Sequence, residues 1–146
     1  MAGAFLWYKS NKAELESDYA YTAQTGTCHA SDYSGVTTDA GYQMITQNSS
    51  SALMASIEAA PTSVAIEADK IAFQGYTSGI LNSDACGTQL DHGVLAVGYG
   101  TENGQAYYLV KNSWGASWGD QGYVKIARVA GAGICGIQMA PVYPVV

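Results

Sequence analysis

The hydrophobic positions of the first sixty residues indicate two short helices separated by a long irregular stretch. Phe5, Leu6 and Lys9 are at helical spacing, which predicts a helix to about residue 10. Residues 17–36 are rich in Tyr, Thr, Gly and Ser without a period, and predict a loop. A second helix is expected before Pro61, with Ser51 as its candidate cap and a buried stripe at positions 53, 54 and 57.

After Pro61 the pattern changes to short runs of β-branched and aromatic residues. Asn103-Gly104 between two such runs is the strongest short-range signal for a β-hairpin. The pattern predicts an antiparallel meander curled into a small barrel. Its expected strands are Ser63–Glu67, Val94–Gly100, Tyr107–Lys111 and Tyr123–Arg128.

Composition narrows the class of protein. The chain has 146 residues with 17 Gly and 11 Tyr, and 12% of its residues are charged, which is typical of a loop-rich β protein, often a secreted one. A net charge of −6 argues against nucleic-acid binding. We find no apolar run of the roughly 18 residues that a membrane span needs, and no basic amphipathic helix for a membrane surface. The start lacks a basic leader region and begins within a helical pattern, so we expect a chain cut from a longer one.

Three cysteines leave at least one thiol unpaired within the chain. One internal disulfide with one unpaired cysteine is the favoured interpretation, and three buried thiols are the alternative.

Residues 48–50, Asn-Ser-Ser, form a sequon for N-glycosylation in a secretory setting, a signal that is weak on its own. No pattern suggests a metal site or a cofactor, and we expect neither.

The predicted hairpin brings one histidine and one asparagine together. His92 and Asn112 lie at similar distances before and after the tip, so antiparallel pairing should place them nearly opposite each other. The amide oxygen could then fix the imidazole tautomer and leave the other ring nitrogen to face a nucleophile. From geometry alone, two residues that merely end neighbouring strands remain the alternative.

The surrounding residues resemble the papain family of cysteine peptidases, most closely its cathepsin L-like branch. Residues 112–123, Asn-Ser-Trp-Gly-Ala-Ser-Trp-Gly-Asp-Gln-Gly-Tyr, are similar to the family's Asn-Ser-Trp-Gly signature. Residues 91–100, which begin Asp-His-Gly-Val, resemble its catalytic-histidine strand, and residues 134–144 resemble its C-terminal segment. The resemblance implies an α+β, papain-like fold. Residues 1–45 would be a remnant of the helical left-hand domain with the crossover, and residues 46–146 the right-hand antiparallel β-barrel.

The resemblance implies a role for each matching residue. His92 would be the general base and acid, Asn112 would orient it, and Trp114 would cover the pair. Trp118 would shape the primed side of the cleft and Asp91 would contribute to its electrostatics, while core packing is the alternative for both tryptophans. Five small or apolar residues match the second subsite, which would favour bulky apolar side chains. They are Met1, Ala65, Leu90, Gly93 and Ala140.

The cysteines match the family in part. Cys86 and Cys135 match a family disulfide, and Cys28 matches a cysteine whose family partner lies upstream. The family's nucleophile lies in a Cys-Gly-Ser-Cys-Trp run, with a Gln just before it, and neither occurs in these residues. Cys28 lies in a Tyr/Thr/Gly loop without the helix start or cation that activates a thiol, which disfavours it as the nucleophile.

Two functions are therefore compared. In the first, the chain is part of a cysteine endopeptidase that cleaves polypeptides, with the nucleophile on a missing fragment or second chain and no activity in isolation. In the second, it is an inactive papain-like component of a larger assembly. The intact His92, Asn112 and Trp114 set favours the first. A lysosomal, vacuolar or secreted location is expected.

Overall fold

The computed structural model describes residues 1–146, which divide into two compact units. Unit 1 comprises residues 1–43 with 144–146, and unit 2 comprises residues 44–143. Strands β1 (Gly41–Met44) and β7 (Val142–Val145) are the segments in which the chain passes from one unit to the other.

Unit 1 contains little regular structure. Its elements are the helix α1 (Ala2–Tyr8) and the 3-10 turn η1 (Ala30–Asp32), and α1 has no buried residue. A β-bridge between Ala13 and Thr37 closes the long loop, and the rings of Tyr19 and Tyr33 stack with centroids 5.1 Å apart. The expected helix and the expected loop after it are both confirmed.

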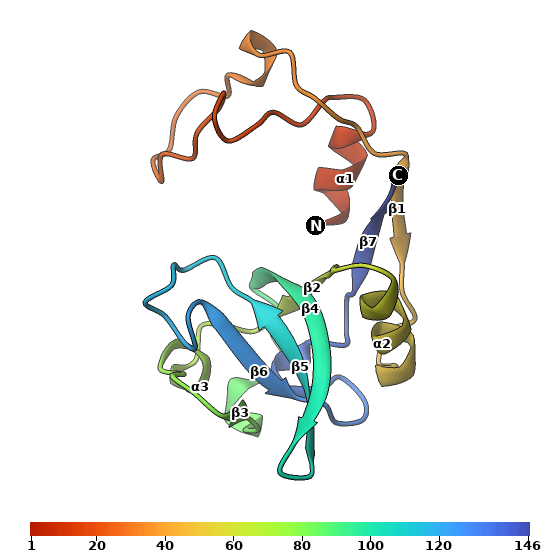
Figure 1. Cartoon of the computed structure of the whole chain (residues 1–146), viewed down its shortest axis with the longest axis vertical. Helices are drawn as coiled ribbons and strands as arrows, with labels where there is room; N and C mark the ends of the chain where they lie inside the picture. The colour runs from red at the N-terminus through yellow and green to blue at the C-terminus, as the bar shows by residue number, and fades with distance from the viewer. The chain divides into compact units, whose positions relative to one another are not determined.

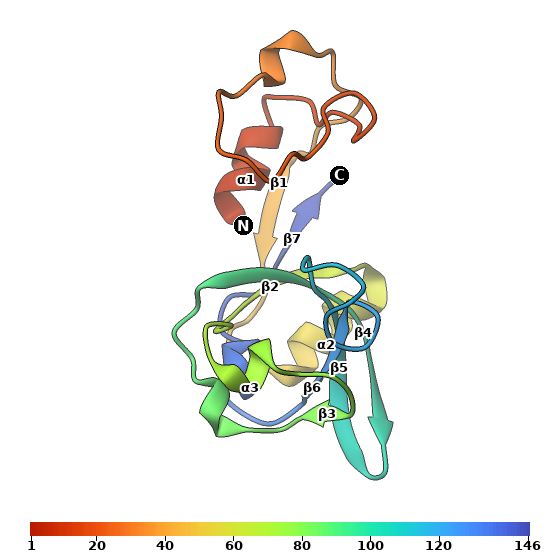
Figure 2. The same cartoon turned by 90° about the vertical axis from the view of Figure 1, so that its left-hand side faces the viewer.

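Unit 2 carries most of the regular elements. In chain order they are α2 (Ser50–Ala59), β2 (Thr62–Ile66), α3 (Ile71–Gln74), β3 (Ile80–Leu81), η2 (Asp84–Cys86), β4 (His92–Glu102), β5 (Gln105–Lys111), β6 (Tyr123–Ala127) and η3 (Ile134–Gly136). The strand order of the sheet is β1-β7-β2-β4-β5-β6-β3. Figure 1 shows β4, β5 and β6 as neighbours, and Figure 2 shows how the strands and loops of unit 2 curl round.

The central hairpin forms where the Asn-Gly signal predicts it. Glu102 pairs with Gln105, and Asn103 and Gly104 have φ of 49° and 81°, as a two-residue hairpin loop of this hand requires. All pairs among β2, β4, β5 and β6 are antiparallel, as expected. The prediction of a wholly antiparallel meander is wrong for β3, which runs parallel to β6. Two apolar residues are too few to show an alternating pattern, so this strand depends on its neighbour.

Helix α2 covers part of the sheet. Its buried residues are Leu53 and Ile57, two of the three positions of the expected stripe. The cap is Ser49 rather than Ser51, because the Ser49 side chain accepts a hydrogen bond from the backbone N–H of Ala52 at 3.3 Å. An N-cap must lie before the first helical turn, and the helix begins at Ser50.

The core of unit 2 is formed by inward-facing side chains of the strands and α2. In β2 the buried residues alternate with half-buried ones, as one covered face of a sheet requires. Tyr108 is fully buried and donates its hydroxyl to Oε1 of Gln138 at 2.7 Å. Burial raises the pKa of Tyr108 to about 12, so it remains a neutral donor. No helix in the structure has the length and apolar character needed to cross a membrane.

Candidate active site

His92 and Asn112 are hydrogen-bonded to each other in unit 2. Nε2 of His92, the first residue of β4, lies 2.8 Å from Oδ1 of Asn112, the residue after β5. The expected contact is therefore present, although the two are not direct partners. The register shifts between Ala96 and Gly98, and the last pair is Leu95 with Lys111. Continuing that register would place residue 94 opposite Asn112, so the histidine reaches it from a diagonal position on the same face.

The tautomer of His92 follows from a second hydrogen bond. The backbone N–H of Ser113 donates to Oδ1 of Asn112 at 2.8 Å, which identifies that atom as the amide oxygen. The oxygen can only accept, so Nε2 of His92 must carry the proton. In the neutral ring the lone pair is then on Nδ1, the nitrogen that can take a proton from a nucleophile.

Trp114 lies against the histidine–asparagine pair. Its ring stacks on the His92 imidazole with centroids 5.1 Å apart and an interplanar angle of 27°. Asn112 is 8% exposed and Trp114 is 40% exposed, so the indole contacts solvent where the amide is withdrawn from it. A hydrogen bond shielded from water is stronger than an exposed one, so this cover helps to hold the ring orientation.

Phe73 of α3 packs against both His92 and Trp114. It is fully buried and meets both Trp114 and His92 edge to face, with centroids 5.5 and 6.4 Å apart. Its ring also packs on Trp118 at 4.9 Å. Such arrangements are favoured by the ring quadrupole. Four aromatic residues thus form one cluster beside His92, namely Phe73, Tyr76, Trp114 and Trp118.

Trp118 is fixed by its nitrogen as well as by its ring. The indole Nε1–H donates to the carbonyl of Gln74, the last residue of α3, at 3.1 Å. The ring also lies 5.9 Å from that of Tyr76. These contacts give Trp118 a packing role in the aromatic cluster. Its ring contacts Trp114, which in turn stacks on His92.

Asp91 ties the start of β4 to the end of β2. Its backbone N–H donates to the carbonyl of Ile66 at 3.0 Å, and its carboxylate accepts from the backbone N–H of Ala68 at 2.8 Å. Ile66 is also the register partner of His92. The carboxylate next to the histidine is therefore engaged with the backbone, which adds a positioning role to the expected electrostatic one.

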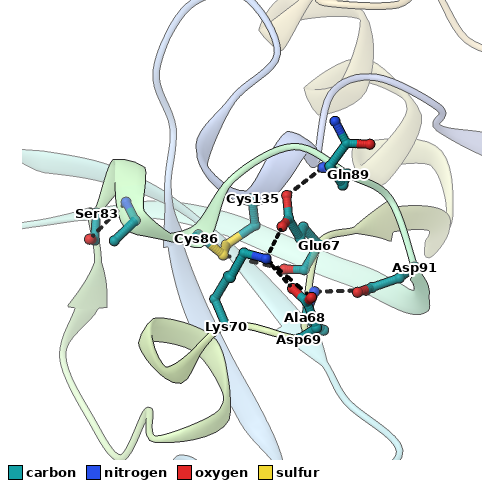
Figure 3. The surroundings of a disulfide bond; sticks show 10 residues. Glu67, Ala68, Asp69, Lys70, Ser83, Cys86, Gln89, Asp91 and Cys135 are labelled. Atoms are coloured by element: carbon teal, nitrogen blue, oxygen red, sulfur yellow. Dashed lines mark hydrogen bonds and ion pairs between the residues drawn. A yellow bond between two sulfur atoms is a disulfide. The ribbon is translucent and has the colours of Figure 1, made fainter.

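Glu67 is a buried carboxylate that holds the loop leading to Asp91 (Figure 3). It accepts a hydrogen bond from the backbone N–H of Gln89 and forms an ion pair with Lys70 at 2.9 Å. The Gln89 hydrogen bond, followed by the contact with Lys70, lowers the pKa of Glu67 below its ordinary value. Gly87 lies so close that a Cβ there would stand 2.2 Å from the carboxylate, which explains a glycine at this position.

The Cys86–Cys135 disulfide lies beside Glu67, as Figure 3 shows. It joins η2 to η3, and both sulfur-bearing residues are buried. The backbone N–H of Glu67 donates to the carbonyl of Cys135 at 2.9 Å. The expected pairing is therefore present, and it anchors the same segment that carries Asp91 and His92.

The residues expected to line a second subsite are divided between the two units. Ala65 of β2 is the register partner of Gly93 of β4, directly after the histidine. Leu90 lies against Gly136, where a Cβ would come within 2.7 Å of its side chain, and Ala140 follows four residues later, half-buried. These four belong to unit 2, and Met1 belongs to unit 1.

Cys28 is exposed and unpaired in unit 1. Near it, Nδ1 of His29 lies 2.9 Å from Oδ2 of Asp32, and both of these side chains are more than half exposed. Cys28 is in a loop just before η1, without a longer helix behind it. That Cys28 is not the nucleophile stays a prediction.

Sequence reasoning missed three contributors to this site. Phe73 and Lys70 belong to a four-residue helix and its cap, too short to give a helical period. Glu67 follows the inward-facing Ile66, at a position where a strand pattern predicts exposure. The only available signal was the cluster of opposite charges at positions 67–70.

The chain was compared with known proteins. The family model described as papain family cysteine protease matches residues 1–145. Probable cysteine protease RD21B of Arabidopsis thaliana is 46% identical over 140 residues, which are 94% of this chain and 30% of that protein. Cysteine proteinase EP-B 1 of Hordeum vulgare is 45% identical, covering 99% of this chain and 41% of that protein.

Solved structures agree with these relatives. The bromelain protease of Ananas comosus, solved with an inhibitor, has a TM-score of 0.92 and 40% identity over 99% of this chain and 68% of that one. Procathepsin L 3 of Tenebrio molitor has a TM-score of 0.89 and 38% identity, covering 48% of that chain. The expected papain-like α+β fold with a right-hand β-barrel is confirmed. The chain spans less than half the length of the two curated relatives, and it belongs to the papain family of cysteine proteases.

Proposed function

We propose that this chain supplies the histidine and asparagine wall of the active site of a papain-type cysteine endopeptidase that hydrolyses polypeptides. The observation that carries the proposal is the His92–Asn112 hydrogen bond, with the amide oxygen fixed by Ser113 and the imidazole covered by Trp114. It leaves Nδ1 of a neutral His92 as a proton acceptor, which is the property that a thiol nucleophile requires.

The reaction assigns one role to each group. A cysteine thiol transfers its proton to Nδ1 of His92, and the sulfur attacks the carbonyl carbon of the scissile peptide bond. His92 then returns the proton to the leaving amine, and water hydrolyses the acyl-enzyme with His92 again acting as the base. Asn112 keeps the ring in its productive orientation, and Trp114 keeps water from the bond between the two.

The expected second subsite enters as part of the same proposal. Four of the expected residues belong to unit 2 and are small or apolar. Ala65 pairs with Gly93 at the start of β4, Leu90 precedes that strand, and Ala140 lies near the end of the unit. Such a surface favours bulky apolar side chains of a substrate. Asp91 and Trp118 are proposed to support the cleft. The contribution of Met1, and the assignment of residues 1–45 and 46–146 to the two family domains, remain predictions.

We further propose that the thiol comes from a polypeptide stretch carrying the family's Cys-Gly-Ser-Cys-Trp run, and that the 146 residues alone do not hydrolyse peptides. General-base groups without a thiolate cannot form the acyl-enzyme. The protein is proposed to act in a lysosome or vacuole or outside the cell. The Cys86–Cys135 disulfide supports this location, because disulfides persist in oxidising compartments.

Covalent labelling tests the proposal. The chain is co-expressed with a family-type fragment that carries the Cys-Gly-Ser-Cys-Trp run, and the complex is treated with an epoxide or vinyl-sulfone thiol reagent. We expect the nucleophilic cysteine of that run, the one directly before its Trp, to be labelled, and His92→Ala to slow labelling by about 10²–10⁴-fold, the usual contribution of acid–base catalysis. His29→Ala is the matched control, because His29 is the only other histidine and is exposed in unit 1. Equal labelling rates in the two variants would contradict the proposal.

No observation favours the alternative, an inactive component of a larger assembly. That alternative does not need a buried Asn112 or a hydrogen bond from its amide oxygen to His92, and both are present. It predicts a stable complex with the fragment and no dependence of labelling on His92, so the same experiment separates the two functions.

A further inference from the structure

The turn before α2 carries a motif that the peptidase chemistry does not use. Asn48, Ser49 and Ser50 form an Asn-X-Ser sequon. None of the other four asparagines is followed by Ser or Thr two residues later. They are Asn11, Asn82, Asn103 and Asn112, with Ala13, Asp84, Gln105 and Trp114 at the third position. The sequence therefore offers a single acceptor for an N-linked sugar.

The backbone holds this acceptor in an exposed turn. Asn48 is exposed and has φ of 56°, a left-handed conformation that asparagine adopts more readily than most residues. Its backbone N–H donates at 2.8 Å to the carbonyl of Gln138, a fully buried residue held by the Tyr108 hydroxyl. The backbone of the turn is thus fixed to the core while Asn48 itself faces solvent, so a sugar on its side chain needs no change of fold.

The residues after Asn48 leave the acceptor sequence intact. Ser49 uses its hydroxyl to cap α2, and Ser50 is the first residue of that helix. Helix α2 buries Leu53 and Ile57, which lie further along the chain, and neither belongs to the sequon. Modification of Asn48 therefore leaves the packing of the helix undisturbed.

The inference rests on the proposed secretory location, which the disulfide supports and in which this modification occurs. Cys86 and Cys135 are joined, and disulfides form in secretory compartments such as the lumen of the endoplasmic reticulum. Asn48 precedes both cysteines in the sequence. In a chain that enters the lumen as it is synthesised, the sequon arrives before the second cysteine, so the closed loop cannot mask it.

We propose that Asn48 is an N-glycosylation site. The sugar donor is a lipid-linked oligosaccharide pyrophosphate, and a membrane-bound oligosaccharyltransferase catalyses the transfer. Nδ2 of Asn48 forms a bond to the anomeric carbon of the first sugar, and the bond from that carbon to the pyrophosphate oxygen breaks. The lipid pyrophosphate leaves with the electron pair, and Nδ2 loses one proton to a base of the transferase. No oxidant or reductant is needed.

The test uses the full chain produced with a cleavable secretory leader in insect cells. Electrophoretic mobility is compared before and after treatment with a peptide N-glycosidase, in lysate and medium, so that a variant that is not exported is still scored. We expect the wild type to shift and Asn48→Asp to show no shift. Aspartate also tolerates the left-handed conformation of the turn, so this variant separates loss of the sugar from loss of the fold.

Two serine variants separate the sequon from the helix cap. Ser50→Ala should abolish the shift because it removes the sequon hydroxyl. Ser49→Ala should retain the shift although it removes the cap of α2. A wild type without a shift, or a shift that survives in Asn48→Asp, would overturn the proposal. So would a shift lost in Ser49→Ala and kept in Ser50→Ala.

Discussion

The two units of this chain differ in how much of their apolar surface they bury. All the buried hydrophobic residues lie between Ile45 and Val142, within unit 2. Unit 1 buries none, and its large exposed side chains include Leu6, Trp7 and Tyr21. Burial of apolar surface is the main favourable term in folding. The comparison indicates that unit 2 contains the stabilising core and that unit 1 adds little stability on its own.

The two histidines also differ in how far their hydrogen-bond partners are buried. His92 in unit 2 is hydrogen-bonded to an amide that is 8% exposed, and it is covered by Trp114. His29 in unit 1 contacts the exposed Asp32, where solvent competes for the interaction. A residue that must keep one orientation during catalysis needs a fixed partner, and only His92 has one. The buried residues of unit 2 therefore both stabilise the fold and hold the orientation of His92.

The largest expected effect comes from removing the disulfide of unit 2. Cys86 and Cys135 are 49 residues apart, and a loop of that length stabilises the folded state by about 4 kcal/mol in the chain-entropy model. The double variant Cys86→Ala/Cys135→Ala should lose about that much free energy of unfolding in urea. Cys28→Ala, in unit 1, should lose less than about 0.5 kcal/mol. Similar losses in the two proteins would contradict the comparison.

A pair of leucine substitutions measures the two units directly. Leu53 is fully buried in unit 2, and Leu15 is 49% exposed in unit 1. Leu53→Ala removes the same atoms as Leu15→Ala but leaves a cavity, so we expect it to cost about 3 kcal/mol in urea unfolding. Leu15→Ala should cost less than about 0.5 kcal/mol. A cost for Leu15→Ala equal to that of Leu53→Ala would show that unit 1 has a core of its own.

A smaller effect is expected from Glu67, and it should depend on pH. The pKa of Glu67 is lowered in the fold, first by the Gln89 backbone N–H and then by Lys70. A carboxylate with a lowered pKa stabilises the fold above its unfolded pKa, about 4.3, and this contribution is lost as pH falls through the folded value. Glu67→Gln should therefore be less stable than the wild type at pH 7, with the difference shrinking at acid pH.

The measurement is urea unfolding of wild type and variant at a series of pH values from neutral to acid. Glu58→Gln serves as the control for the substitution itself, because Glu58 is exposed on α2. If the Glu67→Gln difference stays constant across the series, the ionised carboxylate does not hold the loop before His92.

The sequence predicts the parts of this structure that have a repeating pattern. Strands β2, β4, β5 and β6 were expected to within about two residues at each end, because their inward-facing residues alternate and Asn103-Gly104 marks the hairpin. Strand β3 and helix α3 were missed, since two and four residues are too short to show a period. The conformation of α3 depends on contacts such as those of Phe73 with the two tryptophans, and that of β3 on its pairing with β6.

The candidate site also has features that the sequence predicts and features that it does not. The contact between His92 and Asn112 follows from the hairpin, and the residues around them indicate the family. The diagonal position of His92 relative to Asn112 cannot be predicted in the same way, because no sequence pattern indicates the register shift between Ala96 and Gly98. The burial of the Glu67 carboxylate could not be predicted either, since a charged residue after a strand is usually exposed to solvent.

The most direct test of the central claim is the tautomer of His92, measured by nitrogen-15 NMR on the full chain. The sequence has two histidines, so His29→Gln assigns both signals. We predict that neutral His92 carries its proton on Nε2, bonded to Asn112, while His29 favours Nδ1–H toward Asp32. Asn112→Ala should weaken the Nε2–H preference of His92 and leave His29 unchanged. A neutral His92 protonated on Nδ1, or a His92 signal unaffected by Asn112→Ala, would contradict the account.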